Sequence, residues 1–371
     1  MDRMYLYLRR IRFLIIKELL GLIKDPRSRA IIFVPVFIQS IIFGYAATYN
    51  LDTVPYALLD QSHSKYSGDL ISKLDGTGIF QRTQTLQSSN QIADCIDKDR
   101  ALLVLVIPAD FADKLAAGQE APVQVITDGR NSTTSGIALG YMGSIIAAYN
   151  SQLHMVAPPL QLETISWYNP NLITRWMFLP AMFAMLSLLQ VIILSGLSVA
   201  REREQGTFDQ LLVTPLTPSE ILVGKAVPPL LIGLAQISCV FCITYFWFQV
   251  PFAGSFFDLY LTLAIFLLSC IGIGLSISAI SNNMQQVMVC CFVLLLPMCL
   301  LSGLATPIRN MPELLQYATY LNPMRFALDA VRRIYLEGAS LSTIAFDLVP
   351  MLFIAAITLP VAGWLFRHKL S

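Results

Sequence analysis

The segment that decides the fold is residues 176–199, WMFLPAMFAMLSLLQVIILSGLSV, which contains no charged side chain. An α-helix needs about 20 mostly apolar residues to cross the hydrocarbon core of a bilayer, so this segment predicts a membrane span. Five further windows have the same character: 30–49, 226–248, 258–280, 287–305 and 344–366. We therefore expect an α-helical polytopic membrane protein with six transmembrane helices.

The composition agrees with this class. Of the 371 residues, 55% are hydrophobic and 13% are charged, whereas soluble domains average about 25% charged residues. Lys and Arg (25) nearly balance Asp and Glu (24), so there is no overall field to attract nucleic acid. Within the six windows only Asp258 and Asp347 are charged, and each lies near a window end, where a carboxylate can reach the headgroups.

The positions of the basic residues predict the orientation. Lys and Arg beside membrane spans stay in the cytoplasm, and eight of them precede residue 30, three lie in 200–225 and two follow residue 366. Both termini are therefore expected in the cytoplasm, and residues 50–175 on the external side. The basic start lacks the short apolar core and cleavage site of a cleaved leader, so the first span is expected to remain as an anchor.

Residues 1–29 have a helical pattern of their own. Their apolar positions step by three or four residues: Leu8, Ile11, Ile15, Leu19 and Leu22. Arg10, Lys17 and Lys24 line another face, and Asp25-Pro26 should end the helix, because proline cannot continue the backbone hydrogen bonds. This pattern predicts a cytoplasmic amphipathic helix that lies flat on the membrane surface. The alternative is a plain basic anchor without a partner.

The external block, residues 50–175, resembles ordinary soluble protein. Its apolar runs predict strands at 54–59, 102–107 and 123–127, and helices at 66–74, 91–98, 110–117 and 132–153. Strands separated by helices of this length are typical of an α/β domain with a mixed or parallel sheet. We expect this domain to be inserted between the first and second spans.

Residues that could support catalysis are sparse in this block and elsewhere. His63, His154 and His368 are scattered, and no Cys or His stands at metal-ligand spacing from the first two. The acidic run Asp94, Asp97 and Asp99 alternates with basic residues and fits a solvated helix face better than a calcium loop. We expect neither an enzyme nor a resident metal.

The loop at 200–225 has more structure than a bare connection needs. The alternating charges Arg201-Glu202-Arg203-Glu204 are followed by Gly206-Thr207, a Leu pair, a Thr-Pro turn and Gly224-Lys225. The charged side chains can contact a partner or the amino-terminal helix, and Gly206 permits a reversal of the backbone. This predicts a rigid surface presented to a cytosolic protein, and the alternative is simple anchoring of the span end.

The segment 306–343 is the second candidate region. Pro307, Pro312 and Pro323 should divide it into two short helices, and Arg325, Asp329 and Arg333 recur every four residues, which could form an ion-paired face. The alternative is an amphipathic loop packed on the bundle.

Together these features resemble the membrane permeases of type-2 ABC exporters. The likeness covers nearly the whole chain: a basic start with Lys17-Glu18, an external domain after the first span, the Arg-Glu-x-Glu-x-Gly-Thr run after the second, and Thr306-Pro307 with Asn322-Pro323 after the fifth. It is strongest to bacterial multidrug-type permeases with a large periplasmic domain. The resemblance implies a multi-pass protein of the bacterial inner membrane.

The resemblance also implies roles for individual residues. The ATPase-coupling set is Arg201, Glu202, Arg203, Glu204, Gly206, Thr207, Leu211, Pro215, Lys225, Lys17 and Glu18. Residues 306–343 would form external re-entrant helices, with gate candidates Pro307, Pro312, Asn322, Pro323, Arg325 and Asp329.

The energy source must lie on another chain. No Gly-x-x-x-x-Gly-Lys-Ser/Thr phosphate loop occurs, because Gly224-Lys225 is followed by Ala226. We therefore expect no cofactor on this chain and ATP-Mg on a partner ABC ATPase. The resemblance implies two ATPase subunits beneath two permeases, so a homodimer or a heterodimer with a sister permease. A periplasmic membrane-fusion adaptor is also plausible, and the surrounding lipid is a further partner.

The spans offer few polar groups to a substrate. Gln39, Gln190, Gln236 and Thr244 are those that stand out, and no buried charge marks an ion or proton relay. A hydrophobic or amphiphilic cargo fits better than a sugar or a metal ion. The main alternative is a non-transporting receptor or scaffold whose external domain binds a ligand. A secondary transporter is a third possibility, but clear internal repeats are lacking.

Overall fold

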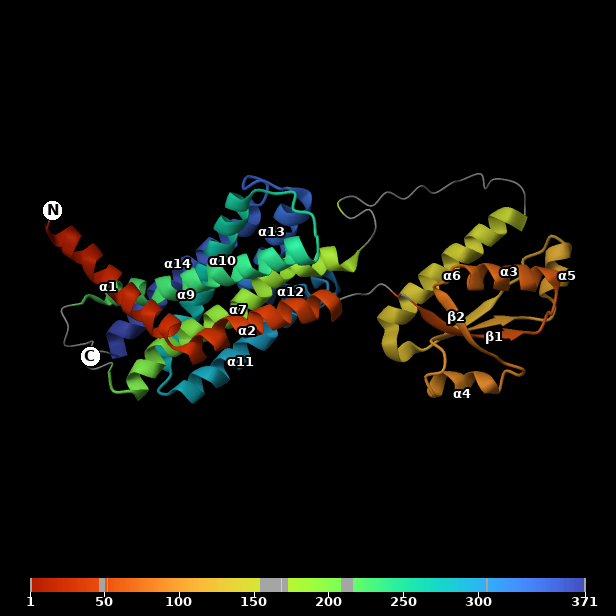
Figure 1. Ribbon diagram of the computed structural model, residues 1–371, viewed down its shortest axis with the longest axis horizontal. Coiled ribbons are helices and arrows are strands. Elements are labelled where there is room, and N and C mark those ends of the chain that lie inside the picture. The colour runs from red at the N-terminus through yellow and green to blue at the C-terminus, as the bar shows by residue number, and fades with distance from the viewer. Residues whose placement is uncertain are drawn as a thin grey trace. The chain divides into compact units, whose positions relative to one another are not determined.

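The computed structural model describes residues 2–46, 51, 53–153, 168, 173–207, 216–304 and 306–369. The chain divides into two compact units (Figure 1). One is helical and consists of Met1–Ala47 with Trp167–Ser371, and the other is an α/β unit, Thr48–Ser166. Each unit is described by itself below.

The α/β unit contains one four-stranded mixed sheet in the order β2-β1-β3-β4. Its strands are β1 (Val54–Asp60), β2 (Phe80–Thr85), β3 (Leu103–Ile107) and β4 (Gln124–Thr127). Its helices are α3 (Lys65–Gly76), α4 (Gln91–Asp97), α5 (Phe111–Ala116), the 3-10 turn η1 (Gly129–Asn131) and α6 (Ser132–Leu153). β1 pairs in parallel with β2 and β3, and β4 is antiparallel to β3. The three predicted strands and four predicted helices are confirmed, and β2 is an addition.

The sheet is covered on both faces, as the alternation of side chains along a strand requires. Tyr56 and Leu58 of β1 pack with Leu70 of α3 and Met142 of α6 on one face. Ala57 and Leu59 pack with Cys95 of α4 on the other face. Figure 1 shows α3 and α6 on one side of the sheet and α4 on the other. The helices thus enclose the central strands and leave β2 as an edge.

The helical unit begins with α1 (Asp2–Lys24) and α2 (Pro26–Ala46), so the predicted break at Asp25-Pro26 is confirmed. Its long helices continue as α7 (Thr174–Glu204), α9 (Pro218–Cys242), α10 (Phe256–Ile280), α11 (Met284–Leu300) and α14 (Ala345–Lys369). The π-helical segment η2 (Ile243–Trp247) prolongs α9. Between α11 and α14 lie η3 (Ile308–Asn310), α12 (Glu313–Ala318), η4 (Thr319–Leu321), α13 (Pro323–Arg332) and the π-helical η5 (Arg333–Glu337).

Within the described residues, five helices are long and apolar enough to cross a membrane. They correspond to the predicted windows 30–49, 176–199, 226–248, 258–280 and 344–366. The sixth predicted window, 287–305, falls on α11, an apolar helix of 17 residues that ends at Leu300. Five of the six predicted windows are therefore confirmed as long apolar helices, and this window forms a shorter helix, because the chain turns at residues 301–304.

α10 lies at the centre of the helical unit, where it packs on α7 and α14. Small residues permit the close approach, as in many membrane helix pairs. A Cβ on Gly274 would lie 2.0 Å from Ser195 Oγ of α7, and one on Gly272 would lie 2.1 Å from Thr358 Oγ1 of α14. Ser269 donates to the Met351 carbonyl of α14 at 2.7 Å. These contacts lock three helices into one core.

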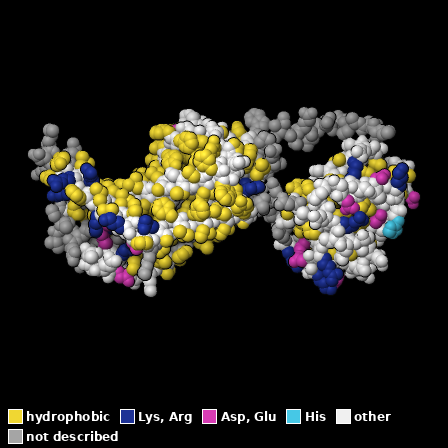
Figure 2. Space-filling model, in the orientation of Figure 1, with side chains coloured by type: hydrophobic (Ala, Val, Ile, Leu, Met, Phe, Trp, Pro, Cys, Tyr) yellow, Lys and Arg dark blue, Asp and Glu magenta, His cyan; other side chains and the backbone are white. Residues whose placement is uncertain are grey.

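The surface of the helical unit is largely apolar. Figure 2 shows hydrophobic side chains over its flank, with Lys and Arg side chains gathered around α1. Large exposed hydrophobic residues lie on the outer helices, among them Phe37 of α2, Val293 and Leu296 of α11, and Phe353 of α14. A continuous apolar surface of this kind is stable in contact with lipid and not with water.

The segment 306–343 contains the two predicted short helices, α12 and α13. The predicted ion-paired face is wrong. Within the described part of the chain, Arg333 pairs with Glu337 at 3.9 Å and with Asp347 at 3.3 Å, and Asp329 forms no ion pair within 4.0 Å. The Arg325 guanidinium lies 4.2 Å from the centre of the Tyr320 ring instead. The face fails because Arg325 stacks on Tyr320 and Arg333 pairs with Asp347 of α14.

Candidate functional site

The site is built where α7 ends, because its last turn carries four of the eleven predicted coupling residues and Gly206 and Thr207 follow directly. Gly206 N–H donates to the Arg203 carbonyl at 3.1 Å, and Thr207 N–H donates to the Glu202 carbonyl at 3.0 Å. Gly206 has φ +67°, so these two bonds form the left-handed helix end in which glycine is preferred. Gly206 therefore has the conformation that a reversal needs, while residues 208–215, into which it leads, lie outside the described residues.

α9 begins with a capping box. Glu220 N–H donates to Thr217 Oγ1 at 3.4 Å, and Thr217 N–H donates to Glu220 Oε2 at 2.6 Å. Pro218 occupies the first turn, where its missing N–H costs nothing. The other Glu220 oxygen lies 3.8 Å from Arg10 Nη1 of α1, so the cap also joins α9 to the amino-terminal helix.

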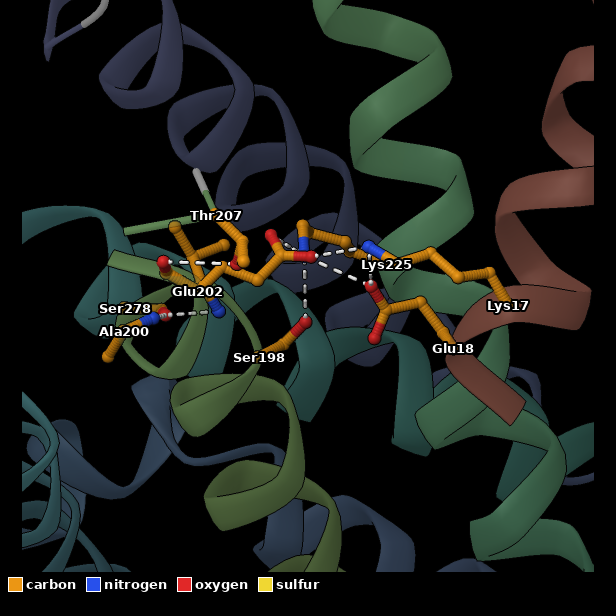
Figure 3. A network of polar contacts seen from close by, with 9 residues as sticks. Lys17, Glu18, Ser198, Ala200, Glu202, Thr207, Lys225 and Ser278 are labelled. Carbon is orange, nitrogen blue, oxygen red and sulfur yellow. Dashed lines mark hydrogen bonds and ion pairs between the residues drawn. The ribbon is translucent and has the colours of Figure 1, made fainter. Parts of the chain in front are cut away.

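Four charged residues from three helices meet between these two ends (Figure 3). Lys17 Nζ of α1 donates to Glu202 Oε1 of α7 at 2.9 Å. Lys225 Nζ of α9 lies 2.7 Å from Glu202 Oε2 and 3.4 Å from Glu18 Oε1 of α1. Lys225 also donates to Ser198 Oγ at 3.4 Å. We call Lys17, Glu18, Glu202 and Lys225 the charged junction.

The charged junction is partly removed from water. The side chain of Lys225 is 0% exposed and that of Glu202 10% exposed, whereas Lys17 is 58% exposed. Burial alone would lower the pKa of Lys17, but the hydrogen bond to Glu202 and the charges of Glu202 and Glu18 outweigh it and raise this pKa. Two cations and two anions compensate one another, as buried charges must.

Apolar packing holds α1 against α9 beside the charged junction. Ile11 and Leu14 of α1 are buried. A Cβ on Gly224 would lie 2.2 Å from Leu14 Cδ2, so only glycine leaves room for the Leu14 side chain at this position. The amino-terminal helix is therefore attached to the bundle by both charge and close packing.

The remaining residues of the charged run point in different directions. Arg203 donates to the Ala279 and Ser281 carbonyls at the end of α10, at 3.3 and 2.9 Å. Glu204 accepts from Met284 N–H at the start of α11 at 3.4 Å. Within the described part of the chain, the Arg201 guanidinium has no hydrogen-bond or ion-pair partner. Leu211 and Pro215 lie outside the described residues.

A cavity of about 630 Å³ opens beside the charged junction, between α1, α7 and α9. Its polar lining includes Lys17, Glu18, Arg201, Glu202 and Lys225, and its apolar lining comes from Leu and Pro side chains. This cavity brings together Arg201 and five of the other predicted coupling residues, Thr207 included, while Arg203 and Glu204 bind elsewhere.

Four of the six predicted gate residues lie at the starts of short helices, and Arg325 and Asp329 lie within α13. Pro307 and Pro312 precede η3 and α12, and Pro323 is the first residue of α13. Asn322 Oδ1 accepts from Met324 N–H at 3.0 Å, and its Nδ2 donates to the Met298 carbonyl of α11 at 2.7 Å. These residues do not join the charged junction.

The two regions lie toward opposite ends of α7. Tyr335 of η5 packs on Phe183 of α7 with ring centres 5.6 Å apart. Phe183 precedes Glu202 by 19 positions, which corresponds to about 28 Å along an α-helix. α7 thus connects the gate candidates with the charged junction.

Sequence reasoning missed some residues of this site. Glu220 was readable as part of a Thr-x-x-Glu capping box, but its contact with Arg10 was not. No local sequence pattern indicated Ser198 or the contact between Leu14 and Gly224, because both depend on how α1 packs on the bundle. Among the described residues, no group of three His, Cys, Asp or Glu residues could hold a metal ion.

Comparisons with known proteins agree with this architecture. A family model described as "ABC-2 family transporter protein" matches residues 28–364. The probable multidrug ABC transporter permease YbhR of Escherichia coli K12 is 42% identical over 359 residues, which cover 96% of this chain and 98% of the relative. YbhS of the same strain, with the same description, is 30% identical over 89% of each chain. The linearmycin resistance permease protein LnrN of Bacillus subtilis 168 is 22% identical over 92% of this chain and 95% of its own. This chain therefore belongs to the ABC-2 transporter family and is a membrane permease subunit of an ABC transporter.

Proposed function

We propose that this chain moves a hydrophobic or amphiphilic substrate out of the cytoplasm or inner leaflet, driven by a separate ATPase subunit. Two relatives are described as probable multidrug permeases and a third as a linearmycin resistance permease, which supports a drug-like or lipid-like cargo. The few polar side chains of the spans support the same class. One of them, Gln236, is already used to hold α9 to the Ile32 carbonyl of α2 at 2.9 Å.

The proposed topology has both termini in the cytoplasm of a bacterium and the α/β unit in the periplasm. α11 serves as the fifth of six spans. Its 17 residues measure about 26 Å at 1.5 Å per residue, and a short helix can be accommodated by local thinning of the bilayer. The basic side chains around α1 support the cytoplasmic side for this end of the bundle.

The charged junction is the observation that carries the proposal. It ties α1 to the ends of α7 and α9 on either side of residues 205–217, the stretch we assign to contact with the ATPase. A displacement of this stretch would be transmitted to both spans, because Glu202 of α7 and Lys225 of α9 are joined directly. In this scheme Gly206 sets the direction of the loop, and Arg201, Arg203, Glu204, Thr207, Leu211 and Pro215 position it.

At the other end of α7, we assign α12 and α13 to external re-entrant helices that shape the exit. α13 packs on α7, α10 and α14, so movement of α7 would reach it. Two permeases, identical or sister chains, would face each other above two ATPases. A periplasmic adaptor would contact the α/β unit.

Copurification tests this function. The tagged full-length chain, extracted from its native membranes, should retain a protein with a phosphate loop, and the reconstituted complex should hydrolyse ATP faster when a hydrophobic drug is added. Glu204→Lys should insert normally and lose this response. If the intact chain recruits no nucleotide-binding protein while its α/β unit binds a ligand, a receptor or scaffold is the correct function.

A further inference from the structure

The cavity beside the charged junction changes in polarity along its length. On α7 its lining runs from Leu194 and Leu197 to Arg201 and Gln205, at helical spacing on one face. On α9 it runs in the opposite sequence direction, from Lys225 to Pro228 and Pro229. The polar end therefore lies at the helix ends, and the apolar end lies one to two turns further into the bundle.

The charges of the cavity do not cancel. Three cations, Lys17, Arg201 and Lys225, face two anions, Glu18 and Glu202. Both lysines are satisfied by the glutamates, at 2.9 Å for Lys17 and 2.7 Å for Lys225. Within the described part of the chain, the Arg201 guanidinium lacks any such partner. A surplus of one positive charge remains, on the side chain best suited to bind a phosphate through two parallel hydrogen bonds.

We propose that this cavity binds one anionic phospholipid of the inner leaflet. Its phosphate pairs with Arg201, with Lys17 at the exposed edge, and one acyl chain lies along Leu194, Leu197 and Pro228. The volume of about 630 Å³ falls in the usual range of small-molecule sites, about 300–1,000 Å³.

A lipid suits this cavity better than a free anion. Seven of the 16 lining residues are Leu or Pro, and an inorganic phosphate would leave their apolar surface wet, whereas an acyl chain removes it from water. The choice of the inner leaflet rests on the proposed function, which places this end of the bundle on the cytoplasmic side. Lipid binding itself requires neither an ATPase nor transport, so its failure would be distinguishable from failure of the proposed function.

Native mass spectrometry of the full-length protein in detergent tests this proposal. We would titrate it with phosphatidylglycerol or phosphatidylcholine of the same chain length. The wild type should retain one phosphatidylglycerol in preference to phosphatidylcholine. Arg201→Gln should weaken phosphatidylglycerol binding about fivefold, the effect of one basic side chain near an anionic lipid, and Arg201→Lys should restore part of it.

Arg12→Gln is the matched control, because Arg12 is an exposed residue of α1 that does not line the cavity. Arg12→Gln removes one positive charge, as Arg201→Gln does, and should leave the preference for phosphatidylglycerol unchanged. Equal losses in Arg12→Gln and Arg201→Gln would overturn the proposal in favour of general surface attraction. Competition by glycerol 1-phosphate at the same concentration would overturn it in favour of a free-anion site.

Discussion

Lys225 Nζ of α9 lies 2.7 Å from Glu202 Oε2 of α7, and Lys225 is completely buried. Residues 23 positions apart in the chain thus form a direct ionic link between two spans, at the point where each span leaves the bundle. Lys17 and Glu18 extend this link to α1. The charged run was predicted to contact a partner or the amino-terminal helix, and Glu202 contacts that helix through Lys17 while it joins α7 to α9.

Removal of Lys225 should destabilise the protein more than removal of the whole pair. Lys225→Met leaves Glu202 buried with only Lys17 as a close cation, and breaking a buried pair typically costs about 3–5 kcal/mol. The double variant Lys225→Met/Glu202→Met should recover most of this loss. Thermal unfolding of the purified protein in detergent measures both. Equal melting temperatures for wild type and Lys225→Met would contradict a structural role for the pair.

Gly206→Leu should strain the end of α7. A non-glycine residue in the left-handed region costs about 1–2 kcal/mol, and no atom of the described residues lies within 4 Å of a Cβ at this position, so we expect a conformational effect. We expect normal membrane insertion and loss of drug-stimulated ATP hydrolysis. Gly206→Asn is the control, since Asn tolerates this conformation, and it should retain most of the response. Full activity of Gly206→Leu would show that the reversal is not needed.

Gly224→Ala should displace α1, because its new Cβ would overlap Leu14. The amide protons of α1 should then exchange faster with deuterium in the detergent-solubilised protein. Gly224→Ala combined with Leu14→Ala should restore slow exchange by making room. Gly21→Ala is the matched control, since none of the described atoms lies within 4 Å of a Cβ there. If both glycine variants behave alike, the Leu14 contact does not hold α1.

The α/β unit should lose stability in acid. The hydrogen bonds from Arg130 lower the pKa of Asp128 below its usual value of 3.8, and those from Lys98 and Lys114 lower the pKa values of Asp94 and Asp110. A carboxyl group whose pKa is lowered by folding stabilises the fold above its unfolded pKa, and this contribution is lost as pH falls through the folded value.

Hydrogen exchange at β3 and β4 in the full-length protein should therefore accelerate as the pH falls from about 5 to below 4, after correction for the intrinsic rate. Asp128→Asn should be less protected at neutral pH and should change less on acidification. Protection that is constant across this range would show that these contacts contribute little to the fold.

Much of the fold could be predicted from the sequence, because the patterns were local. The apolar windows identified the long helices, and Asp25-Pro26 marked the break between α1 and α2. Strand β2 was missed because it is an edge strand in which only Phe80 is buried, so it shows no alternation of apolar residues. The predicted window 287–305 extended too far, since α11 ends at Leu300. Hydropathy alone does not reveal where a helix ends.

The sequence identified the residues of the site but not the contacts between them. Lys17, Glu18, Glu202 and Lys225 were all singled out, but the chain separates the first two from the last two by more than 180 positions. Their contact depends on the packing of Leu14 against Gly224, which no local pattern shows. The predicted face of Arg325, Asp329 and Arg333 failed because the two arginines have other partners, Tyr320 for Arg325 and Asp347 for Arg333, which helical spacing does not reveal.

The central claim is that the charged junction couples the ATPase to the spans, and drug-dependent ATP hydrolysis tests it most directly. The permease and its ATPase would be reconstituted in proteoliposomes as wild type, as Glu202→Lys, and as the exchanged pair Glu202→Lys/Lys225→Glu, which also carries Lys17→Glu and Glu18→Lys so that no like charges meet. We predict that Glu202→Lys keeps the ATPase bound but abolishes stimulation by drug, and that the exchanged pair regains it. Undiminished stimulation in Glu202→Lys, with the ATPase bound, would contradict this account.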